Sequence, residues 1–390
     1  MAGVSAVVSW SSVKVALVIS SLAGGGAERV LSVLASGLAE RGHQVWLLTL
    51  DRSENDVYPL SSAVNRVGLD LLRPAHSMPA AVINNVTRIR VLRKALARTR
   101  AEVVVSFMTS TNVLARLATL GLSKPLIASE RNEPEHQSLG RAWRMLRRHV
   151  VSRSELVVVQ TDRIADWWRE HIPGVDVAVV PNPVQVDADT SPDAATRNVL
   201  AWADGRRIVL AAGRLVRQKG FDLLIEAFSR LRPDRERSWC LVILGEGEER
   251  SHLEHVVEAR DCNDSVLLPG FSSTPHALMR SADIFALSSR FEGMPNVVLE
   301  AMRCGLPVIS YDCPTGPAEL ISHGQTGVLV PAEDVSGFSE ALEALMHDQS
   351  YRKRLGDRAK AGSVQWDLHG VLDQWETVFD NVRRAPPPGL

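Results

Sequence analysis

The sequence predicts an α/β protein made of two similar halves, each a doubly wound parallel sheet covered by helices. Three observations carry this prediction. The chain has 390 residues, more than one ordinary core accommodates, and 45% of them are hydrophobic, enough to fill two cores. Apolar runs of strand length alternate with segments of helical period. The alternation stops at a polar stretch, residues 187–198, and then starts again.

In the first half, the pattern predicts a strand, a helix and a second strand at residues 14–20, 27–41 and 44–50, then strands at 102–107, 125–129 and 156–160. In the second half it predicts strands at 207–212, 239–245, 265–268, 283–287 and 307–311. A last helix, 366–385, ends before a triple proline that cannot continue it. We therefore expect one domain at 1–190, joined by the last helix, and another at 191–365.

The net charge of -1 hides a difference between the halves. Residues 1–190 contain 22 Lys and Arg against 17 Asp and Glu, whereas the rest contains 22 against 28. The first half is therefore expected to face an anionic surface. A pI near 6.8 and the lack of recognition motifs argue against nucleic-acid binding.

Targeting and redox signals favour a cytoplasmic protein. Residues 1–12 carry no basic residue and no apolar run reaches about 18 residues, so we expect neither a signal peptide nor a spanning helix. Any membrane contact should be peripheral, on the inner face of the cell membrane. The cysteines lack metal-ligand spacing, and we expect reduced, buried thiols at Cys240, Cys262, Cys304 and Cys313.

The most informative segment runs from residue 289 to 309. Its carboxylates, Glu292 and Glu300, lie on either side of a loop-to-helix junction, and Pro295 suits a first helical position. The backbone around that helix start can hold a phosphate, and the carboxylates can accept hydrogen bonds from hydroxyl groups. A nucleotide-sugar offers both groups. The backbone positions assigned to this nucleotide-sugar are Gly293, Met294, Pro295 and Asn296.

Two further features fit a diphosphate. Gly25 and Gly26 follow the first strand and let the backbone approach donor phosphates or the acceptor, although nicotinamide-binding domains and purely structural turns share this feature. Arg214 and Lys219 lie just after a strand end, where cations can neutralise a departing diphosphate in place of a metal ion. Taken singly, such cations are more often solvated surface charges.

These motifs occur in a recognisable order over most of the chain: Gly24-Gly25-Gly26-Ala27-Glu28, Gly213-Arg214-Leu215, Gln218-Lys219-Gly220, Gly245-Glu246-Gly247, and Glu292 to Glu300. As a set they resemble glycosyltransferase family 4, whose members have the GT-B fold. The resemblance implies two Rossmann-like domains facing across a cleft, with the last helix crossing back to the first. It also implies a donor site in the second domain, an acceptor site in the first, retention of anomeric configuration, and no bound metal.

The resemblance also assigns roles to residues. It implies that Arg214, Lys219 and Glu292 are catalytic, with Glu292 on the donor sugar's hydroxyls and Glu300 on the ribose hydroxyls. It further implies that the nucleotide base lies beside Gly245, Gly247 and Phe271.

Two segments resemble a bacterial branch that adds N-acetylgalactosamine or related hexoses to undecaprenyl-diphosphate-linked glycans. The first, residues 129–134, lies where many family members carry a histidine, and this chain has none until His136. We assign Glu130 and Asn132 of this segment to the acceptor site. The second is residues 311–320. The donor implied is a UDP-sugar, and the pathway could be O-antigen, capsule or protein glycosylation.

Basic helices give independent support for a lipid-linked acceptor. If residues 86–99 are helical, a basic stripe faces one way and apolar residues face another. A second segment, 141–151, mixes arginines with apolar residues as an interfacial helix would. A plain solvated face remains the alternative for each. The predicted acceptor stripe is Arg90, Arg93, Lys94 and Arg98.

The sequence thus predicts a retaining, metal-independent transferase that moves a sugar from a UDP-sugar to a polyprenyl-diphosphate-linked saccharide. Asp187-Ala188-Asp189 matches a metal-binding pattern, but it lies in the polar linker and is interpreted as linker chemistry. Two alternatives stay open. One is a nucleotide-sugar epimerase or phosphorolytic enzyme of the same fold, and the other is a non-catalytic sugar-nucleotide-binding subunit.

Overall fold

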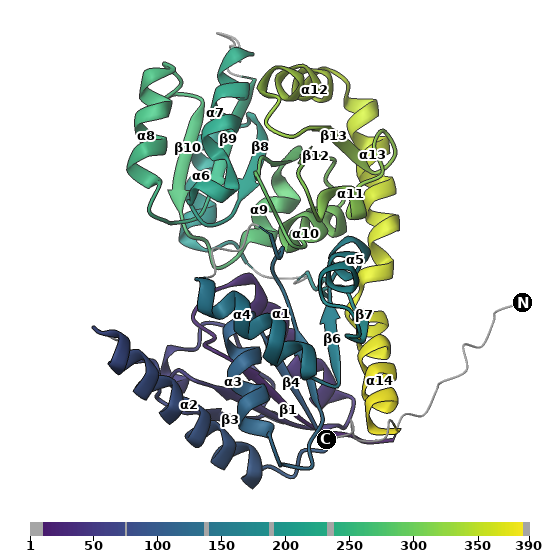
Figure 1. Ribbon diagram of the computed structural model, residues 1–390. Coiled ribbons are helices and arrows are strands. Elements are labelled where there is room, and N and C mark those ends of the chain that lie inside the picture. The colour runs from purple at the N-terminus through teal and green to yellow at the C-terminus, as the bar shows by residue number, and fades with distance from the viewer. Residues whose placement is uncertain (1–10, 75, 136–139, 187–190, 232–237, 385–390) are drawn as a thin grey trace, which may run out of the picture. The chain divides into compact units, whose positions relative to one another are not determined.

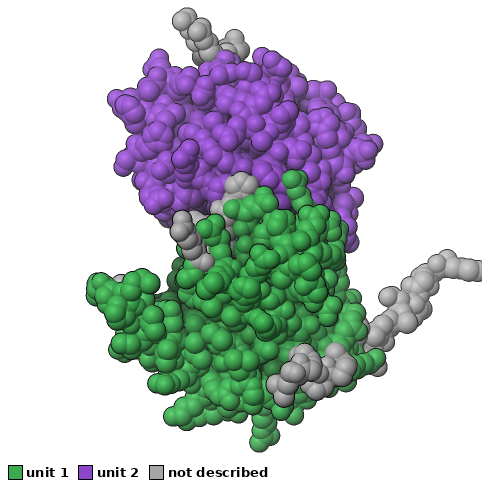
Figure 2. Space-filling model, viewed as in Figure 1, with its two compact units in different colours: residues 1–183, 368–390 green, residues 184–367 purple. Residues whose placement is uncertain are grey.

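A computed structural model describes residues 11–74, 76–135, 140–186, 191–231 and 238–384. The chain forms two compact units, which Figure 2 distinguishes by colour: unit 1 comprises residues 1–183 and 368–390, and unit 2 comprises residues 184–367. The division falls between Pro183 and Val184, whereas the sequence placed it between residues 190 and 191. The Asp187-Ala188-Asp189 pattern, His136 and the triple proline lie outside the described residues.

Unit 1 contains a seven-stranded parallel sheet in the order β3-β2-β1-β4-β5-β6-β7. Its strands are β1 (Lys14–Ile19), β2 (Gln44–Thr49), β3 (Asn65–Gly68), β4 (Val103–Phe107), β5 (Leu126–Ser129), β6 (Leu156–Val159) and β7 (Val177–Val179). The helices are α1 (Gly26–Glu40), α2 (Met78–Arg98), α3 (Thr109–Thr119), α4 (Arg141–Val150), α5 (Asp162–His171) and α14 (Leu368–Arg384). The strand order reverses beside β1, so this is the predicted doubly wound sheet.

The sequence analysis missed both edge strands of this sheet, and it found only the later part of α2. β3 and β7 have only four and three residues and contain no fully buried ones, so they lack the apolar signal of the central strands. α2 begins at Met78 because the Ser77 hydroxyl caps Ala80 N, with Pro79 in the first turn. The Ser77 and Pro79 pair was a readable helix-start signal.

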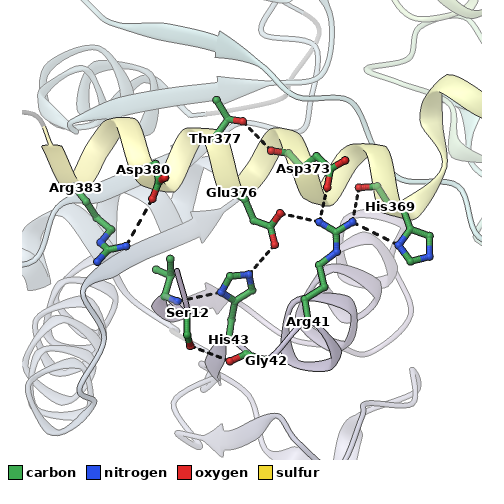
Figure 3. Close-up of polar contacts among 11 residues, drawn as sticks. Ser12, Arg41, Gly42, His43, His369, Asp373, Glu376, Thr377, Asp380 and Arg383 are labelled. Atoms are coloured by element: carbon green, nitrogen blue, oxygen red, sulfur yellow. Dashed lines mark hydrogen bonds and ion pairs between the residues drawn. The ribbon is translucent and has the colours of Figure 1, made fainter. Parts of the chain in front are cut away.

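The last helix, α14, belongs to unit 1, which confirms that it returns to the first domain. Figure 3 shows how it is held. Glu376 of α14 is almost fully buried, and its carboxylate lies 2.7 Å from Arg41 Nη1 and 2.8 Å from His43 Nε2. His43 Nδ1 accepts a hydrogen bond from Val13 N at 3.0 Å, so Nε2 carries the proton that is donated to Glu376. Asp373 adds a second ion pair to Arg41, at 2.6 Å.

Apolar contacts complete this attachment. Trp375 of α14 stacks on Phe107, the last residue of β4, with ring centroids 6.3 Å apart. Both residues belong to the buried cluster that α1, β1 and α14 share. The burial of the apolar face of α14 is therefore what ties this distant segment to unit 1.

Unit 2 contains a six-stranded parallel sheet in the order β10-β9-β8-β11-β12-β13 (Figure 1). Its strands are β8 (Arg207–Ala212), β9 (Trp239–Leu244), β10 (Val266–Gly270), β11 (Ile284–Leu287), β12 (Val308–Asp312) and β13 (Gly327–Pro331). The helices are α6 (Ala194–Ala203), α7 (Phe221–Arg230), α8 (Arg250–Ala259), α9 (Pro275–Ser281), α10 (Asn296–Cys304), α11 (Pro317–Leu320), α12 (Val335–His347) and α13 (Gln349–Gly362). Two buried clusters, one on each face of the sheet, fill this unit.

Candidate active site

The predicted donor residues of unit 2 follow the carboxyl ends of β8, β9, β10 and β11, the edge where parallel sheets bind ligands. Most lie on loops, and Asn296 and Glu300 lie on α10. Two of these loops touch closely through their backbones. Leu215 N donates to Glu246 O and Gly213 N to Leu244 O, each at 2.9 Å. Gly245 has φ +143°, and a Cβ there would lie 1.8 Å from Gly213 O. This glycine is therefore required for loop packing, which the family motif alone did not reveal.

Lys219 and Glu292 meet in this site. Lys219 Nζ lies 2.5 Å from Glu292 Oε1, although 73 residues separate the two in the chain. Glu292 is 6% exposed, and its Oε1 also accepts a hydrogen bond from Ser289 Oγ at 2.6 Å. The hydroxyl of Thr315 donates to the backbone carbonyl of Glu292. The ion pair fixes the ammonium group while leaving it further N–H donors for an anion.

Arg214 differs from Lys219 in its surroundings. Its side chain is exposed, and it forms no ion pair with any residue in the described part of the chain. Arg214 lies between β8 and the short 3-10 turn Arg217–Lys219, and Lys219 is the last residue of that turn. The structure thus offers one cation held by a carboxylate and one that is accessible from solvent.

The segment predicted to bind phosphate is a loop leading into α10. The helix begins at Asn296, with Pro295 as its N-cap. It therefore starts one residue later than predicted, because Pro295 had been expected at the first helical position. Gly305 ends the helix in the left-handed conformation, φ +83°, as predicted. Met294 is buried in the core of unit 2, so its backbone is the part suited to a ligand. The start of α10 adds a helix dipole that favours an anion.

Glu300, on the second turn of α10, is 8% exposed. Its Oε2 lies 3.5 Å from Nε2 of His276, a buried residue of α9. The sequence analysis missed His276 because a lone histidine carries no motif. Its position beside Glu300 gives the predicted ribose-binding carboxylate a fixed neighbour.

Phe271, predicted to border the base, is 66% exposed at the end of β10. The loop behind it is tied to Asp193, the N-cap of α6, whose Oδ2 accepts from Ser273 N at 2.8 Å and Ser273 Oγ at 2.9 Å. Although burial acts to raise it, hydrogen bonds from Thr196 and Ser273 bring the pKa of Asp193 below its usual range. An exposed aromatic ring on a well-anchored loop suits stacking against a base.

The glycine turn of unit 1 is already occupied by a carboxylate. Glu28 Oε2 accepts hydrogen bonds from Gly24 N, at 2.8 Å, and from Gly25 N, and Oε1 accepts one from Ser21 Oγ at 2.5 Å. Gly26 is the first residue of α1. A phosphate that approached Gly25 would therefore compete with Glu28.

Glu130 sits at the end of β5 in a buried polar network. Its Oε1 accepts from Asn112 Nδ2 at 2.8 Å and its Oε2 from Thr109 Oγ1 at 2.5 Å. Burial raises the pKa of Glu130 above its usual value, although these two hydrogen bonds oppose the shift. Met108, just before α3, has the unusual φ of +76°. Because both carboxylate oxygens are occupied and buried, Glu130 is placed to hold the carboxyl ends of β4 and β5 together.

Its neighbours differ in exposure. Asn132 is half-buried at the surface of the same loop. Arg131 is buried, donates to Asn182 Oδ1 at 2.5 Å and lies over the ring of Phe107 at 4.4 Å. Burial lowers the pKa of Arg131 to about 9. The loop therefore combines a surface amide with three buried ionisable residues, Glu130, Arg131 and Glu133, and only Asn132 and Glu130 had been singled out from the sequence.

The basic stripe predicted on α2 is exposed at three of its four positions. Arg90, Lys94 and Arg98 are exposed, while Leu92 and Leu96 on the opposite face are buried. Arg93 was predicted to join the stripe, but its Nη1 donates to the carbonyls of residues 118 and 120 at the end of α3. Its charge complements the α3 helix dipole, so it belongs to the fold of unit 1.

The second basic segment, 141–151, packs part of its apolar face against the protein, which the sequence analysis did not foresee. Trp143, Leu146 and Val150 of α4 pack against the core cluster of unit 1. Arg147 is buried, with its guanidinium 5.0 Å from the ring centroid of Trp167. The protein's own core therefore covers part of this face, which leaves less of it for a membrane than the sequence suggested.

Cofactor and membrane features complete the description. Within the described residues, no group of three or more His, Cys, Asp or Glu is arranged to hold a metal ion. No helix in the described ranges is both long and apolar enough to cross a bilayer. Three of the cysteines, Cys240, Cys262 and Cys313, are buried, Cys304 is half-buried, and all four are free thiols.

Comparison with known proteins places this geometry in a family. Residues 24–188 match the family model described as Glycosyltransferase Family 4, and residues 193–362 match the model described as Glycosyl transferases group 1. Together the two matches span both units. The chain belongs to glycosyltransferase family 4. It is therefore a glycosyltransferase, and the family matches argue against the alternative of a non-enzymatic binding subunit.

Relatives of the family 4 chain agree with this assignment. It is 26% identical, over 95% of its length and 99% of the relative's, to a Campylobacter jejuni enzyme described as GalNAc-alpha-(1->4)-GalNAc-alpha-(1->3)-diNAcBac-PP-undecaprenol alpha-1,4-N-acetyl-D-galactosaminyltransferase. Among solved structures, it resembles sucrose-phosphate synthase from Thermosynechococcus elongatus, with TM-score 0.80, 18% identity, and 95% and 99% of the two chains covered.

A second solved structure is the Anabaena protein HepE in complex with UDP and glucose. It is 17% identical with TM-score 0.77, covering 94% of this chain and 100% of that chain. Both structural likenesses show the GT-B fold, which confirms the predicted fold class.

Proposed function

We propose that this glycosyltransferase moves an N-acetylhexosamine, or another hexose, from a UDP-sugar to a saccharide linked to polyprenyl diphosphate, with retention of configuration. The observation that carries the proposal is the Lys219–Glu292 pair, with the exposed Arg214 on the same loop after β8. This pair supports the proposal because a cation that could neutralise a diphosphate lies next to a carboxylate that could accept hydrogen bonds from sugar hydroxyls. The similarity to the Campylobacter enzyme supports a lipid-linked acceptor and an N-acetylgalactosamine donor.

The proposed chemistry uses positioning and charge. As the bond between the anomeric carbon and the diphosphate breaks, Arg214 and Lys219 stabilise the developing negative charge, together with the start of α10. The acceptor hydroxyl attacks from the face that the diphosphate leaves and transfers its proton to a donor phosphate oxygen. Glu292 accepts hydrogen bonds from the sugar's hydroxyls, and Glu300 accepts them from the ribose. In this proposal the fixed cations neutralise the charge on the departing diphosphate, as a bound metal ion does in other transferases.

The proposed place of action is the inner face of the cell membrane, with α2 as the contact. Its exposed face carries the basic residues Arg90, Lys94 and Arg98 toward one end. Toward the other end it exposes apolar side chains: Met78, Val82, Ile83 and Val86 are 78%, 58%, 64% and 39% exposed. Figure 1 shows α2 on the outside of unit 1. Exposed apolar residues beside cations suit an anionic bilayer or a polyprenyl diphosphate.

The test is a transfer assay with the purified protein, a panel of UDP-sugars and short-chain polyprenyl-diphosphate saccharides. We expect transfer from one UDP-hexose or UDP-N-acetylhexosamine, and a product whose anomeric proton coupling shows the configuration of the donor. An inverted product would overturn the proposed mechanism. Acceptor-independent release of free sugar, or of sugar phosphate, would favour the epimerase or phosphorolytic alternative.

A further inference from the structure

The turn that carries Lys219 and the loop that carries Glu292 are joined by Arg290, a residue that no motif singled out. The Arg290 guanidinium grips Asp222 at two points: Nη1 donates to Oδ1 at 2.9 Å and Nη2 to Oδ2 at 2.7 Å. Nη1 also donates to Arg217 O at 2.9 Å. Arg217 and Asp222 stand on either side of Lys219 in the chain, so one side chain spans the whole turn.

Backbone contacts strengthen the same junction. Arg290 N donates to Gln218 O at 2.8 Å, and Gln218 Nε2 donates to Phe291 O at 2.9 Å. On the other side, Ser288 Oγ donates to Lys219 O at 2.9 Å. A Cβ at Gly220 would lie only 2.1 Å from Ser288 O, so the two segments touch backbone to backbone.

The Arg290–Asp222 pair is built for fixed geometry. A bidentate pair between a guanidinium and a carboxylate sets distance and orientation together. The Arg290 side chain is 17% exposed and that of Asp222 is 31% exposed, so the pair is only partly screened by water. Although burial acts to raise it, the hydrogen bonds and charge of Arg290 bring the pKa of Asp222 below its usual value. The pair is thus charged and intact near neutral pH.

We propose that Arg290, with Asp222, is a positioning residue that holds the Lys219 ammonium where it meets the donor diphosphate. The inference rests on the proposed function, because it gives Lys219 that role. Lysine has a long flexible stem, and a cation acts on a departing diphosphate only when its place is set in advance. Arg290 sets it by fixing the turn at Arg217 and Asp222 against the loop of Glu292. It does not touch the donor itself.

The experiment compares Arg290→Ala, Arg290→Lys and Asp222→Asn with wild type. Arg230→Ala, which removes an exposed arginine at the far end of α7, is the matched control. We expect Arg290→Ala to lower kcat about 30- to 100-fold, because a misplacement of about 1 Å costs rates of that order. Arg290→Lys should recover little, since a lysine cannot form the two-point grip. Arg230→Ala should keep wild-type kcat.

A double variant separates positioning from a general structural role. If Arg290 acts through Lys219, Arg290→Ala added to Lys219→Ala should lower kcat less than about 3-fold further, because the two effects are then not additive. If the double variant loses kcat by the product of the two single losses, the inference is overturned. Near-normal kcat in folded Arg290→Ala would also overturn it.

Calorimetry with UDP alone gives a second readout. We expect Arg290→Ala to weaken UDP binding several-fold when Lys219 is present, but not when it is added to Lys219→Ala. If wild type binds UDP but transfers no sugar, the proposed function fails while this binding cycle still decides the inference. If wild type neither binds UDP nor transfers sugar, both fail.

Discussion

Lys219 Nζ lies 2.5 Å from Glu292 Oε1, and this contact joins two of the motifs by which the chain resembles its family. The partly exposed lysine keeps N–H donors for an anion, while its partner is buried and held by Ser289. A cation and a carboxylate that can accept hydrogen bonds therefore share one site in unit 2. Five predictions follow from the structure around this pair and from the attachments of unit 1.

Removal of either proposed leaving-group cation should slow the chemical step. We expect Arg214→Ala and Lys219→Ala to raise the barrier to turnover by about 2–4 kcal/mol, comparable to the loss of one preorganised donor. Transfer kinetics measure this, and a thermal melt checks folding. Arg214 is exposed, so its variant should melt like wild type, whereas Lys219→Ala leaves Glu292 without its ion pair. Near-normal turnover in both folded variants would contradict the assignment of Arg214 and Lys219 to the leaving group.

Chelation should have little effect on the rate. The proposed mechanism uses fixed cations, so an excess of EDTA should leave kcat almost unchanged. The double variant Asp187→Ala, Asp189→Ala should likewise lower kcat only slightly. Transfer rates before and after dialysis against chelator test this. Activity that falls on chelation and returns with magnesium or manganese would contradict the metal-free mechanism.

The exposed stripe on α2 should act on the acceptor and not on the donor. We expect Arg90→Gln, Lys94→Gln and Arg98→Gln together to raise KM for the lipid-linked acceptor, with the UDP-sugar KM unchanged. The difference from wild type should shrink as salt rises, because salt screens the wild-type attraction.

The matched control neutralises three exposed cations on α13: Arg354, Arg358 and Lys360. Kinetics with lipid-linked and short soluble acceptors should distinguish the two variants. Equal behaviour on the lipid-linked acceptor would identify the α2 stripe as a solvated helix face.

The buried attachment of α14 should dominate the stability of unit 1. Glu376→Ala leaves His43 and Arg41 facing an empty site, and loss of one partner of a buried pair costs about 3–5 kcal/mol. Urea unfolding measures the loss. Asp373→Ala removes only the exposed partner of Arg41 and should cost about 1 kcal/mol or less. Similar losses of unfolding free energy for both variants would show that the buried Glu376 contacts stabilise the protein no more than the exposed Asp373 contact does.

Glu130 predicts a specific pH dependence of stability. Its pKa is raised in the folded state, mainly by burial, above the value of about 4.3 for an exposed glutamate. The folded protein therefore holds this proton more tightly than the unfolded chain does. The resulting stability is fully present below the unfolded pKa and is lost as pH rises through the folded pKa.

Glu130→Gln should remove this dependence, since a glutamine can still hydrogen-bond with Asn112 and Thr109. Relative to wild type, the variant should gain stability as pH rises from 4 toward 7. Urea titrations across that range measure the free energy of unfolding. A difference that stays constant with pH would show that Glu130 does not titrate as its burial predicts.

The sequence by itself determined the alternation of strands and helices, because buried parallel strands are continuous apolar runs such as β1 and β9. It also marked Lys219, Glu292 and Glu300, since glycines and proline frame them at fixed spacing. It could not find β3 or β7, which are too short to carry a periodic signal.

Only the tertiary structure decided which cation is paired and which is open. It directed the Arg93 side chain of α2 to the end of α3, away from the exposed stripe, and it packed part of the apolar face of α4 against the core. It also brought Arg290 to Asp222, and His43 to Glu376, across 68 and 333 residues. Local sequence encodes the period and the caps of each element. Which side chains meet depends on how the finished sheets bring their loops together, and no local pattern contains that information.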